Sequence, residues 1–287
     1  MLGFFSGWLR ETAGARGLPC VDLWGPLNDI TFSQRRAQPD FTLVPDAIHP
    51  GEAGQFIMAY QLLWQFNPDR KSVSSIAISK RGERWIAAGA AAGGAVSELQ
   101  ELPDGKGLSF THLAPALPWV VPDSGSALDL KWESKEPAAL GMALTSAGHR
   151  LGAERLKISG LAPGSYEIRI DGQPIGKPVP HTTLAAKIEL QAIAATPQHA
   201  QALQVALLNR ERNDQAMRPL RDLWSSIKSL RNGLGKAAPE KRAAMEQELA
   251  AKLASAQKFT ALGREFEDKI RDAAQPKPRR YEVRLVP

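Results

Sequence analysis

Asp46 and His49 are the two residues of this sequence whose types and spacing best fit a chemical task. They lie three positions apart in "PDAIHPGEAGQ" (residues 45–55), directly before Pro50 and an apolar, helix-like run. A catalytic imidazole needs one ring nitrogen held by a carboxylate, which fixes its tautomer and stabilises the imidazolium that forms on protonation. A short separation in a tight loop allows the carboxylate to reach Nδ1 and directs Nε2 outward. The pattern therefore indicates two members of a Ser-His-Asp triad.

The same short pattern also admits a purely structural interpretation, in which Asp46 caps the turn and His49 is a bystander. A nucleophile would decide between the two, because a histidine base without one has nothing to activate. Ser6 and Ser33 lack the sequence surroundings of a nucleophilic serine. Cys20 lies in "GLPCVDLW", which predicts a buried strand, so we interpret it as a small core residue rather than a reactive thiol.

No metal ion or cofactor is predicted. The histidines His112, His149, His181 and His199 are scattered and show no metal-ligand spacing, and each is interpreted as a surface or core residue. The glycine-rich "GAAAGGA" (89–95) lacks the lysine and the following helix of a phosphate-binding loop.

The composition is that of a globular chain. Its 287 residues are 43% hydrophobic and 23% charged, which suffices for two modest domains. The net charge of +6 arises in residues 204–287, where 18 Lys and Arg stand against 11 Asp and Glu. This excess is interpreted as a solvated helical face of mixed signs, so no nucleic-acid partner is predicted, although the charge alone leaves a nucleic-acid or anionic-surface partner conceivable. No apolar run approaches the ~20 residues of a membrane span, and "MLGFFSGWLR" is a poor signal peptide.

The patterning around the Asp–His pair predicts the end of an α/β domain over residues 1–67. A helix is expected over 3–16, a short strand buried on both faces of a parallel sheet over 18–24, and an amphipathic helix over 51–66. Residues 25–45 are expected to be a loop or a short helix. Helix, strand, loop and helix in this order make up the end of an α/β domain and not the whole of one.

A small β-rich region is predicted over 73–190, after a linker at 67–72. It is expected to be sandwich-like, or a sheet packed on its neighbour. In "LKISGLAPGSYEIRIDGQPIG" two strands, 156–159 and 165–170, are joined by a Pro-Gly turn, and Asp171-Gly172 forms a second turn.

Residues 196–274 are predicted to form an antiparallel helical hairpin. Thr196 and the proline after it are typical of a helix start. Pro219 should kink or interrupt the first helix, and "NGLGKAAPEK" (232–241) should reverse the chain. The alternating "RRYEVRLV" then predicts a closing strand within 277–287, which we expect to return to the β-rich region.

The segment "VDLWGPLND…FTLVPDAIHPGEAGQFIMAYQLL" resembles the last block of the SGNH, or GDSL-type, ester hydrolases. In that family the Asp and His of the triad sit in D-x-x-H-P, between the last strand of the sheet and the final helix. "LKISGLAPGSYEIRIDGQPIG", "TPQHAQALQVALLNRERND" and "QPKPRRYEVRL" look like the C-terminal extension of one bacterial subgroup. The resemblance implies the C-terminal end of a flavodoxin-like α/β domain, followed by a small β region with an antiparallel helical hairpin.

The resemblance also implies a reaction: hydrolysis of carboxylic (acyl or acetyl) esters, without metal or cofactor, with Asp46 orienting His49 as the base. The family's serine sits upstream in a G-D-S block, and no such block precedes Asp46 here. Asn28 in "GPLND" has the wrong spacing for the family's oxyanion asparagine. We therefore expect a truncated C-terminal portion that is inactive alone, in which Met1 is an internal methionine of a longer hydrolase. A periplasmic or secreted location would fit the full-length form.

Two further interpretations stay open. In one, the chain is a non-catalytic interaction module whose β region and basic hairpin bind a partner, a carbohydrate or a surface, and the Asp–His pair is a relic. In the other, an upstream hydrolase segment supplies the serine half in trans. The two interpretations differ in whether Asp46 and His49 point into an open cleft, which favours a catalytic site, or are packed under other side chains.

Overall fold

Two β-sheets, built from the segments with alternating apolar residues, form the centre of the molecule. The computed structural model describes residues 2–66, 72–88, 93–122 and 137–287. The first sheet has the order β2-β1-β5-β9 and contains β1 (Ser74–Arg81), β2 (Arg84–Ala87), β5 (Glu154–Ser159) and β9 (Ile188–Glu189). In this sheet β1 and β5 run parallel, and the other neighbours pair antiparallel.

The second sheet is antiparallel and has the order β3-β4-β10-β6-β7, with β8 also paired to β6. Its strands are β3 (Ala95–Glu101), β4 (Gly107–Leu113), β6 (Ser165–Ile170), β7 (Gln173–Pro174), β8 (Val179–Pro180) and β10 (Arg279–Val286). The strand predicted at the end of the chain is β10, and it lies between β4 and β6.

Both sheets contribute side chains to one core, so they form a sandwich. Ile76 and Ile158 of the first sheet are buried together with Phe110 of the second. The rings of Phe110 and Tyr281 stack with their centroids 4.9 Å apart, at an angle of 7°. This core follows from the period-two burial along β1, β5 and β6.

The strands predicted at 156–159 and 165–170 are β5 and β6, but they belong to different sheets and do not pair. The connection between them therefore carries the chain from one sheet to the other. The turn at Asp171-Gly172 is present and joins β6 to β7, with φ of 51° and 81° at its two residues. Both residue types tolerate this left-handed conformation.

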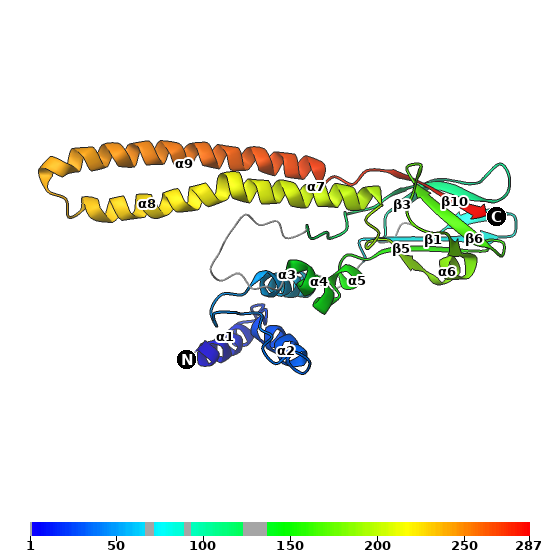
Figure 1. Cartoon of the computed structure of the whole chain (residues 1–287), viewed down its shortest axis with the longest axis horizontal. Helices are drawn as coiled ribbons and strands as arrows, with labels where there is room; N and C mark the ends of the chain where they lie inside the picture. Colours follow the sequence, from blue (N-terminus) through cyan, green and yellow to red (C-terminus); the bar gives the residue numbers. More distant parts are fainter. Residues whose placement is uncertain (1, 67–71, 89–92, 123–136) are drawn as a thin grey trace.

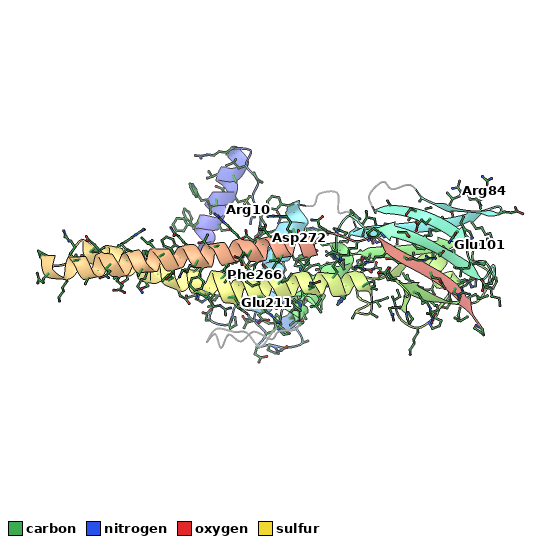
Figure 2. All side chains as sticks on the ribbon, turned by 90° about the horizontal axis from the view of Figure 1, so that it is seen from above. Arg10, Arg84, Glu101, Glu211, Phe266 and Asp272 are labelled. Carbon is green, nitrogen blue, oxygen red and sulfur yellow. The ribbon has the colours of Figure 1, made fainter. Side chains whose placement is uncertain are left out.

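The helical hairpin extends away from the sandwich, as Figures 1 and 2 show. It comprises α7 (Pro197–Arg212), a π-helical turn η1 (Asn213–Met217), α8 (Arg218–Leu234) and α9 (Pro239–Ala273). Thr196 caps α7, because its side chain accepts the N–H of His199 at 3.3 Å. The helix is interrupted at η1, as predicted from Pro219. Proline has no N–H to donate to the carbonyl four residues back, and its ring displaces that carbonyl.

None of the helices in the described ranges combines the length and apolar character that crossing a membrane requires.

Five helices from two parts of the chain lie below the hairpin in Figure 1. They are α1 (Leu2–Ala15), α2 (Trp24–Arg35), α3 (Glu52–Phe66), α4 (Ala138–Thr145) and α5 (Ala147–Arg150), while α6 (His181–Ala186) lies at the sandwich. The helices predicted over 3–16 and 51–66 are α1 and α3. A second core, with Phe41, Leu43 and Ile57, joins α2, α3 and α4.

The prediction of a strand over 18–24 is wrong. Residues 18–23 have no regular structure, α2 begins at Trp24, and the described residues 2–66 contain no strand. A strand buried on both faces needs neighbouring strands for its backbone N–H and C=O groups, and none of the described strands lies beside this segment. Asp22 instead accepts the N–H of Gly25 at 3.0 Å at the start of α2, and Cys20 is exposed rather than buried.

The observed fold is therefore a mixed α/β fold of sheets and helices. The flavodoxin-like sheet expected for residues 1–67 is absent from the described part of that segment, where α3 packs on α4 instead. The division into domains stays a prediction.

Candidate active-site dyad

A tight loop before α3 holds the two residues that the sequence singled out. The loop is closed by two backbone hydrogen bonds: Ala47 N–H donates to the carbonyl of Val44 at 3.1 Å, and Gly51 N–H donates to that of Leu43 at 3.0 Å. Leu43 is buried, which fixes one end of the loop on the second core. Ala47 adopts a φ of 63°, and the chain turns back on itself there. The loop geometry thus positions residues 46–49 at the start of α3.

Asp46 and His49 are in direct contact within this loop. The Oδ2 atom of Asp46 lies 2.6 Å from Nδ1 of His49. The other oxygen, Oδ1, accepts the backbone N–H of Ile48 at 3.0 Å and that of His49 at 2.6 Å. The carboxylate is therefore fixed by the loop backbone on one side and by the imidazole on the other.

These hydrogen bonds determine the charge of the carboxyl. The backbone N–H of His49, then its side chain, then the N–H of Ile48 hold the pKa of Asp46 far below its usual value. Asp46 is thus an ionised acceptor at neutral pH, and Nδ1–H of His49 is its donor. Nε2 is then the nitrogen that exchanges a proton with a reacting group. The side chain of Asp46 is 38% exposed and that of His49 is 55% exposed, so neither is packed under other residues.

The structure brings Asp46 and His49 together with the geometry that the spacing predicted, and their catalytic role stays a prediction. Asn28 lies on α2 and donates its Nδ2 to the carbonyl of Trp24 at 2.8 Å, a contact within its own helix. Ser6 and Ser33 are exposed residues of α1 and α2.

A second histidine–carboxylate pair occurs where α5 meets β9. Nδ1 of His149 lies 2.8 Å from Oε1 of Glu189, and Gln191 donates to the same carboxylate at 2.7 Å. Burial raises the pKa of Glu189, but the hydrogen bonds from His149 and Gln191 outweigh it and lower the pKa. The sequence offers no signal for this pair, because its members are 40 positions apart. In the part of the chain that the structure describes, no backbone N–H donates to Glu189 as two do to Asp46, which makes this pair a useful control for the dyad.

Two other histidines have structural hydrogen bonds. Nε2 of the buried His112 lies 2.9 Å from the carbonyl of Gly93, and burial lowers the pKa of this imidazole. Nδ1 of His181 accepts the N–H of Gly164 at 3.2 Å. Both rings therefore hold turns and strand ends in place.

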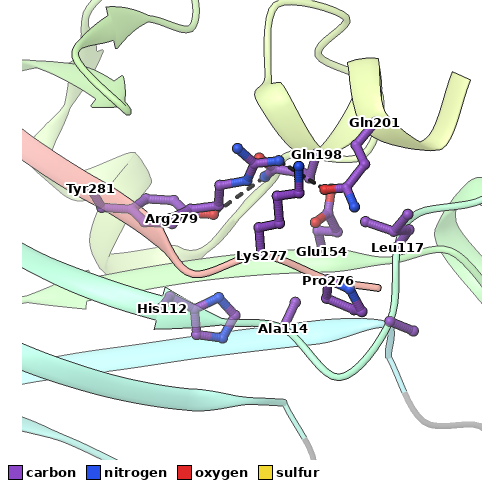
Figure 3. A pocket seen from close by; sticks show the side chains of 11 residues that line it. His112, Ala114, Leu117, Glu154, Gln198, Gln201, Pro276, Lys277, Arg279 and Tyr281 are labelled. Atoms are coloured by element: carbon purple, nitrogen blue, oxygen red, sulfur yellow. Dashed lines mark hydrogen bonds between the residues drawn. The ribbon is translucent and has the colours of Figure 1, made fainter. Parts of the chain in front are cut away.

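Sequence reasoning missed a cluster of buried polar side chains at the base of the hairpin. Glu154, Gln198, Gln201 and Tyr281 converge there on a small cavity, shown in Figure 3. They come from β5, α7 and β10, so no spacing along the chain could have joined them.

Comparison with known proteins shows a likeness in fold. No family model matches the chain, and no curated protein does. A solved structure of a gut microbial diltiazem-metabolizing enzyme is similar, with a TM-score of 0.74 and 24% sequence identity. The match covers 98% of this chain and 65% of that enzyme, so the chain corresponds to less than two thirds of its length. The chain therefore has the fold of the matched part of a drug-metabolizing enzyme.

Proposed function

We propose that this chain carries the histidine–aspartate half of a carboxylic-ester hydrolase of the SGNH type. One observation carries the proposal: the 2.6 Å contact between Asp46 Oδ2 and His49 Nδ1, in a loop whose backbone holds the other carboxylate oxygen. The fold likeness to a diltiazem-metabolizing enzyme supports it at the level of an enzyme fold. The exposure of both side chains also fits a working dyad better than a relic under other residues.

In the complete enzyme, each residue would have a distinct task. His49 would take the proton of a serine hydroxyl at Nε2 as the serine oxygen attacks the acyl carbonyl, and would return it to the departing alkoxide. Water would then attack the acyl-serine and give a proton to Nε2, which would return it to the serine oxygen as the acid departs. Asp46 would hold Nδ1–H throughout and stabilise the imidazolium at each step.

The serine and the oxyanion donors would come from a further hydrolase segment, and the surface of the N-terminal helices supports this part of the proposal. Six aromatic residues of α1, α2 and α3 are exposed: Phe4, Phe5, Trp8, Trp24, Phe32 and Phe66. At ~200 Å² for each ring and roughly two thirds exposure, they present about 800 Å² of apolar surface. One partner contributes about that area to a standard protein interface. In α3, Glu52 is the one charged residue, as expected of a helix covered on more than one side.

The test compares this chain with a protein extended by the coding sequence upstream of Met1. The extended protein should contain a G-D-S block and should hydrolyse p-nitrophenyl acetate; diltiazem is the second substrate to test, because the similar structure is of a diltiazem-metabolizing enzyme. His49→Ala should reduce kcat by at least ~10⁴-fold, because no other group takes the serine proton. The chain alone should show no turnover above the buffer rate.

His149→Ala in the extended protein is the matched control, since it removes an exposed histidine that is also held by a carboxylate at Nδ1. Its activity should equal that of the parent. Equal activity of His49→Ala and the parent would refute the role of the dyad. Turnover by the chain alone that is lost in His49→Ala would refute the absence of a nucleophile from these 287 residues.

A further inference from the structure

A cavity of about 10 Å³ lies where the helical hairpin joins the two sheets. Glu154, the first residue of β5, lines it from the first sheet, Tyr281 of β10 from the second, and Gln198 of α7 from the hairpin. Figure 3 shows these side chains pointing toward one another across the junction. All three residues are at least nine-tenths buried. The cavity has room for about one water molecule.

Two buried oxygen atoms at this junction have no hydrogen-bond donor among the described residues. They are Oε2 of Glu154 and Oε1 of Gln198. One N–H of Gln198 Nε2 donates to the Tyr281 hydroxyl at 3.3 Å, and a side-chain hydrogen bond from Gln198 also acts on the carboxyl of Glu154. Two buried acceptors without a donor are unfavourable; a proton on the carboxyl supplies a donor, as does a water molecule in the cavity.

Among the described residues, the charged and titratable side chains around Glu154 do not donate a hydrogen bond to its carboxyl in place of that proton. Burial lowers the pKa of His112, whose Nε2 lies 2.9 Å from the carbonyl of Gly93. Arg279 donates to Asp171 at 2.9 Å and to Gln201 at 2.8 Å. Lys277 lines the cavity with an exposed side chain.

The remaining titratable neighbours are neutral or lie on Glu154's own strand. Burial, and then the charge of Glu154, raises the pKa of Tyr281, so its hydroxyl keeps its proton. Arg155 follows Glu154 on β5, and its Nε is buried without a partner among the described residues.

We propose that Glu154, Gln198 and Tyr281 form a proton-linked joint that attaches the helical hairpin to the sandwich. In the protonated form, the Glu154 hydroxyl donates to Gln198 Oε1 and Gln198 Nε2 donates to Tyr281. When Glu154 ionises, the amide either faces a carboxylate without a donor or turns, so that Nε2 donates to Glu154 and Tyr281 donates to Oε1. Both arrangements keep a hydrogen bond between Gln198 and Tyr281, but each leaves a buried charge on Glu154 that no cation of the described residues pairs with. Ionisation therefore favours opening of the joint, which returns the carboxylate to water. The inference is independent of the ester-hydrolase proposal.

The pKa of Glu154 places this change near neutrality. Burial raises it from 4.5 to about 7, against an opposing hydrogen bond from Gln198. Because the pKa is higher in the folded state than in the unfolded state, the carboxyl stabilises the fold fully below about pH 4.5. That contribution is lost as the pH rises through about 7. This difference between the two pKa values corresponds to a change of up to ~300-fold in the equilibrium for opening the joint, between a pH well below 4.5 and a pH well above 7.

Two measurements on the whole chain test the joint. Carboxyl ¹³C NMR of glutamate-labelled protein, assigned by its loss in Glu154→Gln, should show a titration displaced well above 4.5. Hydrogen exchange of the first turns of α7, corrected for the intrinsic rate, should show protection falling by tenfold to ~70-fold from pH 5 to pH 8. Glu154→Gln should remove that dependence, because a neutral amide replaces the protonated carboxyl.

Glu265→Gln is the matched control, since it makes the same change at an exposed residue of α9, and it should keep the parent's pH dependence. Gln198→Leu removes the acceptor and should lower the protection of α7 already at pH 5. A Glu154 resonance that titrates near 4.5 would overturn the proposal, and so would equal pH dependence in Glu154→Gln and the parent. If Glu154→Gln does not fold, the carboxyl resonance whose titration changes in Gln198→Leu is assigned to Glu154. The pH at which that resonance titrates in the parent protein then decides between the two outcomes.

Discussion

Gly141 lies where α4 crosses α3, and its replacement by alanine tests whether this close approach anchors the helix that follows the dyad loop. A Cβ at this position would lie 2.7 Å from the carbonyl oxygen of Ala53 and 2.9 Å from Cβ of Phe56. Both atoms belong to α3, and the nearer one is backbone. Neither can rotate away, so α4 must move off α3 to admit the methyl group.

The magnitude follows from two opposing effects. Glycine to alanine inside a helix gains about 1 kcal/mol of helix propensity. Overpacking costs about 1–3 kcal/mol, and we take the upper value because the obstruction is backbone. The net expectation for Gly141→Ala is a loss of about 2 kcal/mol in the free energy of unfolding, or roughly 30-fold in the equilibrium constant.

Gly148→Ala provides the matched control. Its Cβ would meet nothing closer than Cε of Met142 at 3.7 Å, an ordinary van der Waals distance. This variant should be as stable as the parent or more stable by up to about 1 kcal/mol. Urea unfolding followed by tryptophan fluorescence suits the comparison, because Trp119 stacks on Phe56 at 4.4 Å. Hydrogen exchange should place the loss in α3, and equal stability of the two variants would refute the reasoning.

Three further predictions follow from single contacts. Asp46→Asn should move the proton of neutral His49 from Nδ1 to Nε2, because the amide nitrogen takes the place of Oδ2 and donates; ¹⁵N NMR of the ring checks this, and an unchanged tautomer would contradict it. Gly107→Ala should destabilise the fold by about 3 kcal/mol in urea titrations, because its Cβ would lie 2.0 Å from the carbonyl oxygen of Val283; a stability near that of the parent would show that β4 and β10 are not so close. Cys20 is exposed, so Ellman's reagent should modify it in the folded protein; a thiol that reacts only in urea would support the buried strand instead.

Features with a local physical cause could be predicted from the sequence. Thr196 with its following proline starts α7, and Pro219 interrupts the first arm of the hairpin. The contact between Asp46 and His49 follows from three-residue spacing in a loop, where backbone N–H groups are within reach of the carboxylate. In each case the determining atoms lie within a few residues along the chain.

Features that depend on distant neighbours could not be predicted. The segment at 18–24 has the composition of a strand, but strand formation requires partners, and none of the described strands accompanies it. The contact between Gln198 and Tyr281 spans 83 positions, and only the return of β10 to the sandwich brings these residues together. The assignment of β5 and β6 to separate sheets likewise depends on which strands arrive beside them.

The position of β10 has a consequence for how the protein is made. Its partners β4 and β6 precede it in the chain, and the whole hairpin of α7, α8 and α9 is synthesised between β6 and β10. Until β10 leaves the ribosome, β4 and β6 each present an unpaired edge, and side chains such as Phe110 and Ile168 lack the strand that separates them. Closing this sheet requires contacts of long sequence separation, which fold slowly. We therefore expect nascent chains that end within the hairpin to depend on chaperones, whereas the hairpin itself forms from neighbours in sequence as it emerges.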